Sequence, residues 1–144
     1  MADIKVFSTQ AEYKALESFL GTRLYEYNAA VTGVYDAQYL GLQIESARNE
    51  VVAGVAGHTW CNTCFLGYVW VNERDRGKGY GKRLLEAVEH EVRKRGCRNI
   101  VLSTHSFQAP RFYERMGFER SAEVTGHPEG HSNIWYTKTL EKGI

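Results

Sequence analysis

The sequence contains little proline, no long apolar run and few cysteines. Only two of its 144 residues are proline, and no segment is low in complexity, so we expect little disorder beyond the termini. No stretch approaches the ~18 apolar residues needed to cross a bilayer, and Met1 to Lys5 lack the start of a signal peptide. Three cysteines, an odd number, do not suit a disulfide framework. The sequence therefore predicts a cytoplasmic protein with reduced thiols and no membrane partner.

An excess of charge of either sign is also absent. The 18 Lys and Arg residues nearly balance the 17 Asp and Glu residues, which gives a net charge of +1. Because a nucleic-acid-binding domain usually carries a basic surface, we expect no nucleic-acid partner. Basic residues crowd a single ten-residue stretch, where they are Arg74, Arg76, Lys78, Lys82 and Arg83. A patch of this size suits a phosphorylated small molecule better than a polymer.

Periodicity, capping signals and turn residues predict a strand, a helix, three strands, a helix, a strand, a helix and two strands. The expected strands are Ile4–Ser8, Tyr39–Ala47, Val51–Trp60, Cys64–Val71, Ile100–Leu102, Glu119–Val124 and Asn133–Leu140. The expected helices run from Thr9 to about Asn28 with a break near Gly21, from Tyr80 to Arg95, and from Pro110 to Gly117. Turns are expected at Asn49-Glu50, at Asn62-Thr63 and over 126–130, while residues 28–36 show no clear pattern.

This order of elements indicates the fold class. Three consecutive strands joined by short turns pair antiparallel. A strand–helix–strand unit follows them, and such units are parallel and right-handed. The sequence therefore predicts one α/β domain over residues 1–144, built on a mixed, mostly antiparallel sheet flanked by helices.

The segment between Val69 and Leu85 carries the clearest chemical signal. A predicted strand leads into RDRGKGYG, residues 74–81, and a long amphipathic helix follows at once. The first N–H groups of a helix have no partner within it, and together with the helix dipole they bind anions. Glycines let the backbone approach the anion closely. We therefore predict a phosphate-binding loop here.

Two common phosphate-binding patterns do not fit this loop. A Walker A motif needs GxxxxGK followed by Ser or Thr, but here Gly81-Lys82 precedes Arg83, and Arg76 stands where the first glycine is required. A dinucleotide fingerprint needs G-x-G-x-x-G after the first strand of its unit. The glycines here are each two positions apart, and three predicted strands come before them.

The pattern that does fit is R-x-x-G-x-G. It occurs as Arg76, Gly79 and Gly81, and also two residues earlier, starting at Arg74. The register that starts at Arg76 places Gly81 at the beginning of the helix, so we prefer it.

The stretch from Leu66 to Phe118 resembles the acetyl-CoA-binding half of the GNAT superfamily of N-acetyltransferases. The resemblance rests on an apolar strand, the R-x-x-G-x-G loop, an amphipathic helix, a further strand and the ending FYERMGF, all at matching spacing. Shorter segments such as RGC and SFQAP resemble a subgroup of small bacterial acetyltransferases. The resemblance implies a single GNAT domain that uses acetyl-CoA as cosubstrate.

The resemblance also implies cofactor contacts. Backbone amides from Arg76 to Gly81 would bind the pyrophosphate. Val69 and Val71 would pair their main chain with pantetheine, and the Val69 N–H would polarise the thioester carbonyl. Many family members have Asn where this sequence has Gln108 or a neighbour. The full set of expected contacts is Val69, Val71, Arg76, Gly77, Lys78, Gly79, Tyr80, Gly81, Lys82, Gln108 and Phe112.

Tyr113 is the expected general acid, since the resemblance places it near the sulfur of CoA. A phenol stays protonated at neutral pH and can donate a proton to a thiolate. Transfer from a thioester to an amine needs no covalent enzyme intermediate. The candidates for a general base are Glu45, His58 and Glu73, although a substrate amine of low pKa would need no base.

Two further motifs have ordinary structural interpretations. Cys61 and Cys64 lie near His58, but a structural zinc site needs four ligands, so we expect two strand cysteines and no metal. The loop with His127 and His131 is interpreted as a turn, with a role in gating the substrate as the alternative. Aromatic residues in the unassigned segment after the first helix are expected to select the acceptor; they are Tyr25, Tyr27 and Tyr35, together with Asn28.

The predicted function is transfer of acetyl from acetyl-CoA to a primary amine of a small molecule. A peptide or protein N-terminus is the alternative acceptor, and a non-catalytic CoA-binding sensor is the alternative class. The C-terminal strands offer a surface for a homodimer.

Overall fold

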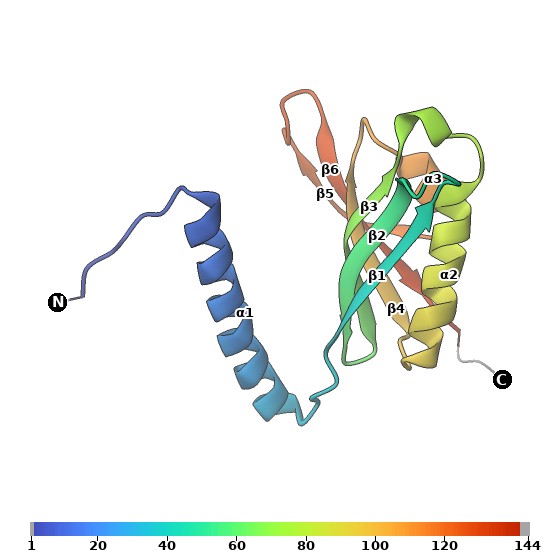
Figure 1. The fold of residues 1–144 in the computed structure, drawn as a ribbon. Helices are drawn as coiled ribbons and strands as arrows, with labels where there is room; N and C mark the ends of the chain where they lie inside the picture. Colours follow the sequence, from blue (N-terminus) through green and yellow to red (C-terminus); the bar gives the residue numbers. More distant parts are fainter. Residues whose placement is uncertain (1, 142–144) are drawn as a thin grey trace. The chain divides into compact units, whose positions relative to one another are not determined.

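The computed structural model describes residues 2–141 (Figure 1). Its elements are α1 (Gln10–Thr32), β1 (Gln38–Glu45), β2 (Val51–Trp60), β3 (Thr63–Val71), a 3-10 turn (Glu73–Asp75), α2 (Tyr80–Lys94), β4 (Asn99–His105), α3 (Pro110–Arg115), β5 (Glu119–Thr125) and β6 (Ser132–Thr139). The chain divides between Tyr35 and Asp36 into two compact units. Within residues 2–141, no helix combines the length and apolar character needed to cross a membrane.

The first unit is built around α1. The Thr9 hydroxyl caps the helix by accepting a hydrogen bond from the Glu12 N–H at 3.3 Å, as the capping box predicts. The helix ends at Gly33, which has a φ of 73°. The predicted break near Gly21 is wrong, because a glycine inside a helix costs only about 1 kcal/mol and α1 runs through it. The helix therefore continues past the predicted end at Asn28.

The predicted strand Ile4–Ser8 is also wrong, since these residues form neither helix nor strand. An alternating pattern becomes a strand only when another strand supplies hydrogen-bond partners. Among the described residues of this unit there is no such strand.

The second unit contains a six-stranded sheet in the order β1-β2-β3-β4-β6-β5. All neighbouring pairs are antiparallel except β3 and β4, which are parallel. The predicted fold class, a mixed and mostly antiparallel sheet with helices, is confirmed. The strand β4 is longer than the predicted Ile100–Leu102, because its polar end pairs with β6 as far as His105.

The hydrophobic core lies between α2 and one face of this sheet. Leu84, Leu85, Val88 and Val92 form the apolar stripe of α2, and all four are buried. The helix packs against β1, β2 and β3 (Figure 1). Burying a side chain of this size contributes roughly 1.5–3 kcal/mol, so this stripe fixes the position of α2 and of the loop before it.

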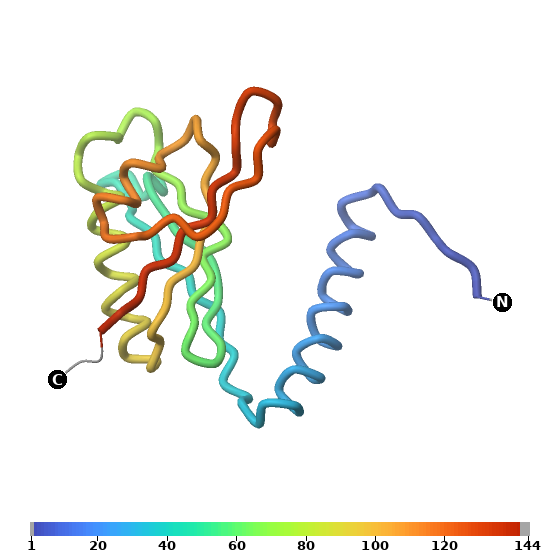
Figure 2. Tube along the Cα trace, turned by 180° about the vertical axis from the view of Figure 1, so that it is seen from behind, coloured from blue at the N-terminus to red at the C-terminus, as the bar shows by residue number. Residues whose placement is uncertain are grey.

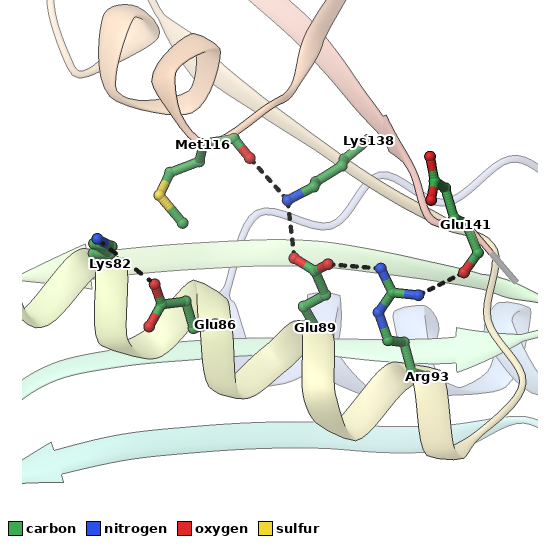
Figure 3. A network of polar contacts seen from close by, with 7 residues as sticks. All are labelled: Lys82, Glu86, Glu89, Arg93, Met116, Lys138 and Glu141. Carbon is green, nitrogen blue, oxygen red and sulfur yellow. Dashed lines mark hydrogen bonds and ion pairs between the residues drawn. The ribbon is translucent and has the colours of Figure 1, made fainter. Parts of the chain in front are cut away.

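A polar clamp ties α2 to the C-terminal part of the unit (Figure 3). The Lys138 ammonium donates to the Glu89 carboxylate and to the Met116 carbonyl, both at 2.9 Å. Arg93 donates to Glu89 at 2.8 Å and to the Glu141 carbonyl. Burial would raise the pKa of Glu89, but the hydrogen bonds from Lys138 and Arg93 outweigh it and hold the pKa below its usual range. The clamp joins α2 to β6 and to the end of α3.

The turn between β2 and β3 lies one residue earlier than predicted. Cys61 and Asn62 have φ values of 48° and 68°, as a two-residue hairpin turn of type I′ requires. Cys61 is therefore a turn residue and not a strand residue, while Cys64 and Cys97 are buried.

Candidate functional site

The parallel strands β3 and β4 separate after a short paired segment. Thr63, Cys64 and Phe65 pair with Asn99, Ile100 and Val101, and no pair follows among the described residues. From there β4 continues beside β6, as far as the pair of His105 with Asn133. The β4-facing edge of β3 is therefore open from Leu66 to Val71.

A bulge in β3 accompanies this separation. Gly57 on β2 pairs with Leu66, whereas Ala56 pairs with Tyr68, so Gly67 is an extra residue. A Cβ atom on Gly57 would lie 2.0 Å from the Phe65 carbonyl oxygen. Only glycine permits this close approach of the two backbones, and the bulge bends β3 where it leaves β4.

The direction of the backbone groups on β3 follows from its last hydrogen bond. The Asn72 N–H, just beyond the strand, donates to the Val52 carbonyl of β2 at 2.7 Å. Successive N–H groups of a strand point to opposite edges. The N–H groups of Val71 and Val69 are therefore directed away from β2, toward the open edge.

The loop before α2 ends in free backbone donors. Gly77 and Gly79 both have a φ of 82°, in the left-handed region that favours glycine. Gly79 caps α2 without a side-chain hydrogen bond, and the first helical bond is donated by Arg83 to Gly79 at 3.1 Å. Within residues 2–141, the N–H groups of residues 77–82 donate no hydrogen bond. This arrangement can bind an anion at the helix N-terminus.

The charged side chains of the loop are only partly free. The Lys78 ammonium donates to Asp75 at 2.9 Å, and Asn72 donates to the same carboxylate at 3.0 Å. The hydrogen bond from Lys78 lowers the pKa of Asp75, and the hydrogen bond to Asp75 raises the pKa of Lys78. In the described part of the chain, Arg76 is exposed and forms no salt bridge. The Arg76 guanidinium is therefore more available to bind an anion than the Lys78 ammonium, which is paired with Asp75.

Phe112 connects α3 to the start of α2. A Cβ atom on Gly81 would lie 3.1 Å from the Cζ atom of Phe112. Glycine at position 81 thus lets the Phe112 ring pack against the first turn of α2. The contact places α3 beside the glycine loop.

Tyr113 is buried between aromatic rings, with 6% of its surface exposed. Ring centroids lie 5.2 Å away for Phe112, 5.8 Å for Phe118 and 6.1 Å for Tyr136. Burial raises the pKa of Tyr113 to about 12. In residues 2–141 its hydroxyl has no hydrogen-bond partner, so the proton remains available to a ligand.

The Gln108 side chain is engaged within its own loop. Its amide oxygen accepts hydrogen bonds from the His105 N–H at 2.7 Å and from the Thr104 hydroxyl at 3.2 Å. The Gln108 N–H in turn donates to the His105 carbonyl at 2.9 Å. Gln108 therefore closes a turn directly after β4, and only its amide NH₂ group is left for a ligand.

The structure does not bring the three candidate bases together. His58 lies on β2, with its ring 5.6 Å from that of Phe65. Glu45 ends β1 and accepts a hydrogen bond from Gln43 at 2.7 Å. Glu73 lies in the 3-10 turn before the glycine loop.

A cluster of aromatic rings that the sequence analysis missed lies at the end of β4. The rings of His105 and Phe107 stack at 5.2 Å, nearly parallel at 5°. His127 lies 5.2 Å from His105, and His131 lies 4.9 Å from Phe107. The tripeptide His105-x-Phe107 at the end of a buried strand was the available signal.

Three loops gather at one end of this unit, as Figures 1 and 2 show from opposite sides; they cover residues 72–79, 106–109 and 126–131.

A cavity of about 230 Å³ lies elsewhere, lined by the turn at Cys61 and the end of α2 near Arg95. The Arg95 guanidinium is used there to bind the Tyr39 carbonyl and the Thr59 hydroxyl. In the described part of the chain, no three His, Cys, Asp or Glu side chains are grouped to hold a metal ion.

Comparisons with known proteins point to one family. The model of the acetyltransferase (GNAT) family matches residues 8–118. An acetyltransferase of Agrobacterium fabrum is 34% identical over 133 residues, which cover 92% of this chain and 96% of that protein. The blasticidin-S acetyltransferase of Streptomyces morookaense is 33% identical over 94 residues, covering 65% of this chain and 69% of that protein. The crystal structure of an acetyltransferase from Bacillus cereus matches with a TM-score of 0.78 and 28% identity, covering 96% of this chain and 98% of that one.

Proposed function

The chain belongs to the acetyltransferase (GNAT) family, and from this premise we propose that it transfers acetyl from acetyl-CoA directly to a primary amine of a small molecule. The observation that carries the proposal is the separation of β3 from β4 beside a helix N-terminus with free donors. An extended ligand with a diphosphate at one end suits both features. The pantetheine arm of CoA carries amide groups that can bond to a strand edge.

The proposed contacts concern the pyrophosphate and the pantetheine arm of the cofactor. The N–H groups of 77–82 would hold the pyrophosphate, because a helix N-terminus favours negative charge. The main chain of Val69 and Val71 would bind the pantetheine amides along the open edge of β3. Arg76 would add charge, whereas Lys78 would contribute less because Asp75 already holds its ammonium.

Two groups would then act on the thioester. The Val69 N–H would stabilise negative charge on the carbonyl oxygen, and one such donor is typically worth about 3 kcal/mol. Tyr113 would give its proton to the departing sulfur, since burial keeps the phenol protonated. Holding both substrates in one complex would supply much of the remaining acceleration.

A small-molecule acceptor is supported by the Streptomyces relative, which is named for blasticidin S. The absence of excess charge is also consistent with a small acceptor, because a large anionic or cationic partner favours an oppositely charged surface.

Calorimetry with CoA and a thiol-release assay with a panel of amines would test the proposal. We expect saturable binding of CoA and release of its thiol that depends on the amine. No association with CoA would refute the proposal. Binding without turnover on any amine or peptide would favour a sensor, and turnover on peptides alone would change the acceptor class.

A further inference from the structure

We propose that His105 is the general base of the transfer, taking a proton from the acceptor ammonium at its Nε2 atom. This inference rests on the proposed function, because it concerns the same gap between β3 and β4. It adds a fourth candidate to Glu45, His58 and Glu73, which the structure does not bring together.

The tautomer of His105 is the first observation. Its Nδ1 atom lies 3.1 Å from the His127 carbonyl oxygen. A carbonyl oxygen can only accept a hydrogen bond, so Nδ1 carries the hydrogen. In the neutral imidazole the lone pair is then on Nε2, which hydrogen-bonds to nothing in residues 2–141. An acceptor on Nδ1–H is the usual device by which proteins orient a basic histidine.

The ring is also held in one plane. Phe107 stacks on one side of it, and the His127 ring meets it edge-on at 5.2 Å. The backbone on either side is fixed, because His105 bonds to Gln108 at both its N–H and its carbonyl. The loop of His127 is joined to the same turn, since Ser106 and Ser132 exchange hydrogen bonds of 2.8 and 3.0 Å.

The register of the parallel strands places His105 at the reacting end of the gap. Phe65 and Val101 are the last paired residues. Four positions further on, the two strands reach Val69 and His105. The bulge shortens the advance of β3 by about one residue, so these two residues are level to within roughly 3.3 Å along the sheet. The proposed oxyanion donor and His105 thus lie on the two borders of one gap.

The face of the sheet completes the geometry. Ile100, Leu102 and Thr104 are buried, and His105 belongs to the alternate, more exposed set with Val101 and Ser103. His105 therefore lies on the face opposite α2, whereas Tyr113 belongs to the core on the side of α2. A base on one face and an acid on the other suit a reaction in which one group takes a proton from the ammonium and a different group gives a proton to sulfur.

The proton balance is complete. His105 removes one proton from the acceptor ammonium, and the free amine nitrogen forms the C–N bond to the acetyl carbon. As the C–S bond breaks, Tyr113 gives its proton to sulfur and receives the second proton of the nitrogen. The products are an amide and a free thiol, and His105 returns its proton to water.

The test compares His105→Asn with wild type on a primary alkyl amine, protonated at neutral pH, and on hydroxylamine, which is largely unprotonated. We expect turnover of the alkyl amine to fall about 100-fold or more, with a much smaller loss for hydroxylamine and unchanged CoA binding by calorimetry. Added imidazole should partly restore His105→Ala. The control is His90→Asn, on an exposed position of α2, which should behave as wild type.

Equal losses on both amines, or none, would overturn the assignment, as would His58→Asn having the effect expected of His105→Asn. Nitrogen NMR of labelled protein provides a readout independent of the acceptor, and a hydrogen on Nε2 instead of Nδ1 would also overturn it. Failure of the proposed function is distinguishable, because wild type would then either not bind CoA or bind it without turnover on any amine.

Discussion

At the scale of single residues, the proposed proton chemistry depends most on Tyr113. Its phenol is buried among three other aromatic rings, and its pKa of about 12 keeps it protonated throughout the neutral range. In residues 2–141 no buried side-chain polar atom lacks a hydrogen-bond partner, so the unbonded Tyr113 hydroxyl oxygen must be reached by solvent although its ring is buried. The hydroxyl is therefore accessible to a ligand atom.

Replacing Tyr113 with Phe should lower kcat tenfold or more, because the departing thiolate would lose its proton donor. The affinity for CoA, measured by calorimetry, should not change. Tyr136→Phe is the matched control, since its hydroxyl bonds to Glu114 at 2.7 Å and takes no part in the transfer. A kcat for the Tyr113 variant equal to that of wild type would remove the phenol from the mechanism.

Gly79 is the second informative residue, because its φ of 82° is strained for any other side chain. Gly79→Ala should weaken CoA binding by calorimetry and lower the free energy of unfolding by about 1–2 kcal/mol. Gly96→Ala is the control, since Gly96 has a φ of 81° at the other end of α2. It should cost the same stability and leave CoA affinity unchanged. Equal weakening by both variants would contradict a local role for the glycine loop.

At the scale of elements, the shape of the site depends on how β2 and β3 meet. Their contact at Gly57 and Phe65 leaves no room for a side chain. The bulge that results belongs to β3, but the residue that permits it belongs to β2.

Gly57→Ala should therefore force the two strands apart, lower the free energy of unfolding by roughly 2 kcal/mol or more, and abolish CoA binding. Denaturant unfolding and calorimetry measure the two effects. Gly41→Ala on β1 is the control, because a Cβ atom there meets nothing within 4 Å. If the Gly57 variant bound CoA normally, the bulge would have no part in forming the gap.

The polar clamp on α2 should make stability depend on acid pH. The pKa of Glu89 is lower in the folded chain than its usual value of 4.5. The stabilisation it provides is thus complete above about 4.5 and is lost as the pH falls through the folded value. Glu89→Gln should lower the free energy of unfolding by about 1–3 kcal/mol at pH 7.

The difference between Glu89→Gln and wild type, measured by urea unfolding, should shrink below pH 4.5. Glu86→Gln should change little, since its ion pair with Lys82 is exposed and 3.9 Å long (Figure 3). A pH-independent difference for the Glu89 variant would mean that its charge is not involved.

At the scale of the whole molecule, ligand binding should appear as thermal stability. Acetyl-CoA at 100 times its dissociation constant should stabilise the folded chain by about 2.7 kcal/mol. For a chain of this size, we expect a rise in Tm of several degrees. ATP and NAD at the same concentration should give much smaller shifts, because the loop lacks their binding patterns. Equal shifts from all three would indicate a general nucleotide-binding site.

Much of this architecture could be predicted from the sequence because it is determined locally. The meander, the glycine loop and α2 follow from alternation, turn residues and the stripe of Leu84 to Val92. The strand at Ile4–Ser8 could not be judged, since pairing depends on distant residues. The ring cluster at His105 was missed for the same reason, because His105 and Phe107 lie far along the chain from His127 and His131 and contact them only in the folded structure.

The short parallel ladder has a mechanical consequence. Among the described residues, only three residue pairs, all between β3 and β4, join the half-sheet of β1, β2 and β3 to the half-sheet of β4, β6 and β5. The two half-sheets are therefore joined along only part of their shared edge. The hydrogen bond from Lys138 on β6 to Glu89 on α2 limits how far they can move apart. A pantetheine arm bound between β3 and β4 would bridge the two half-sheets and reduce their relative motion. The amide hydrogens of Val69 and Val71 would then exchange slowly with solvent only when CoA is bound.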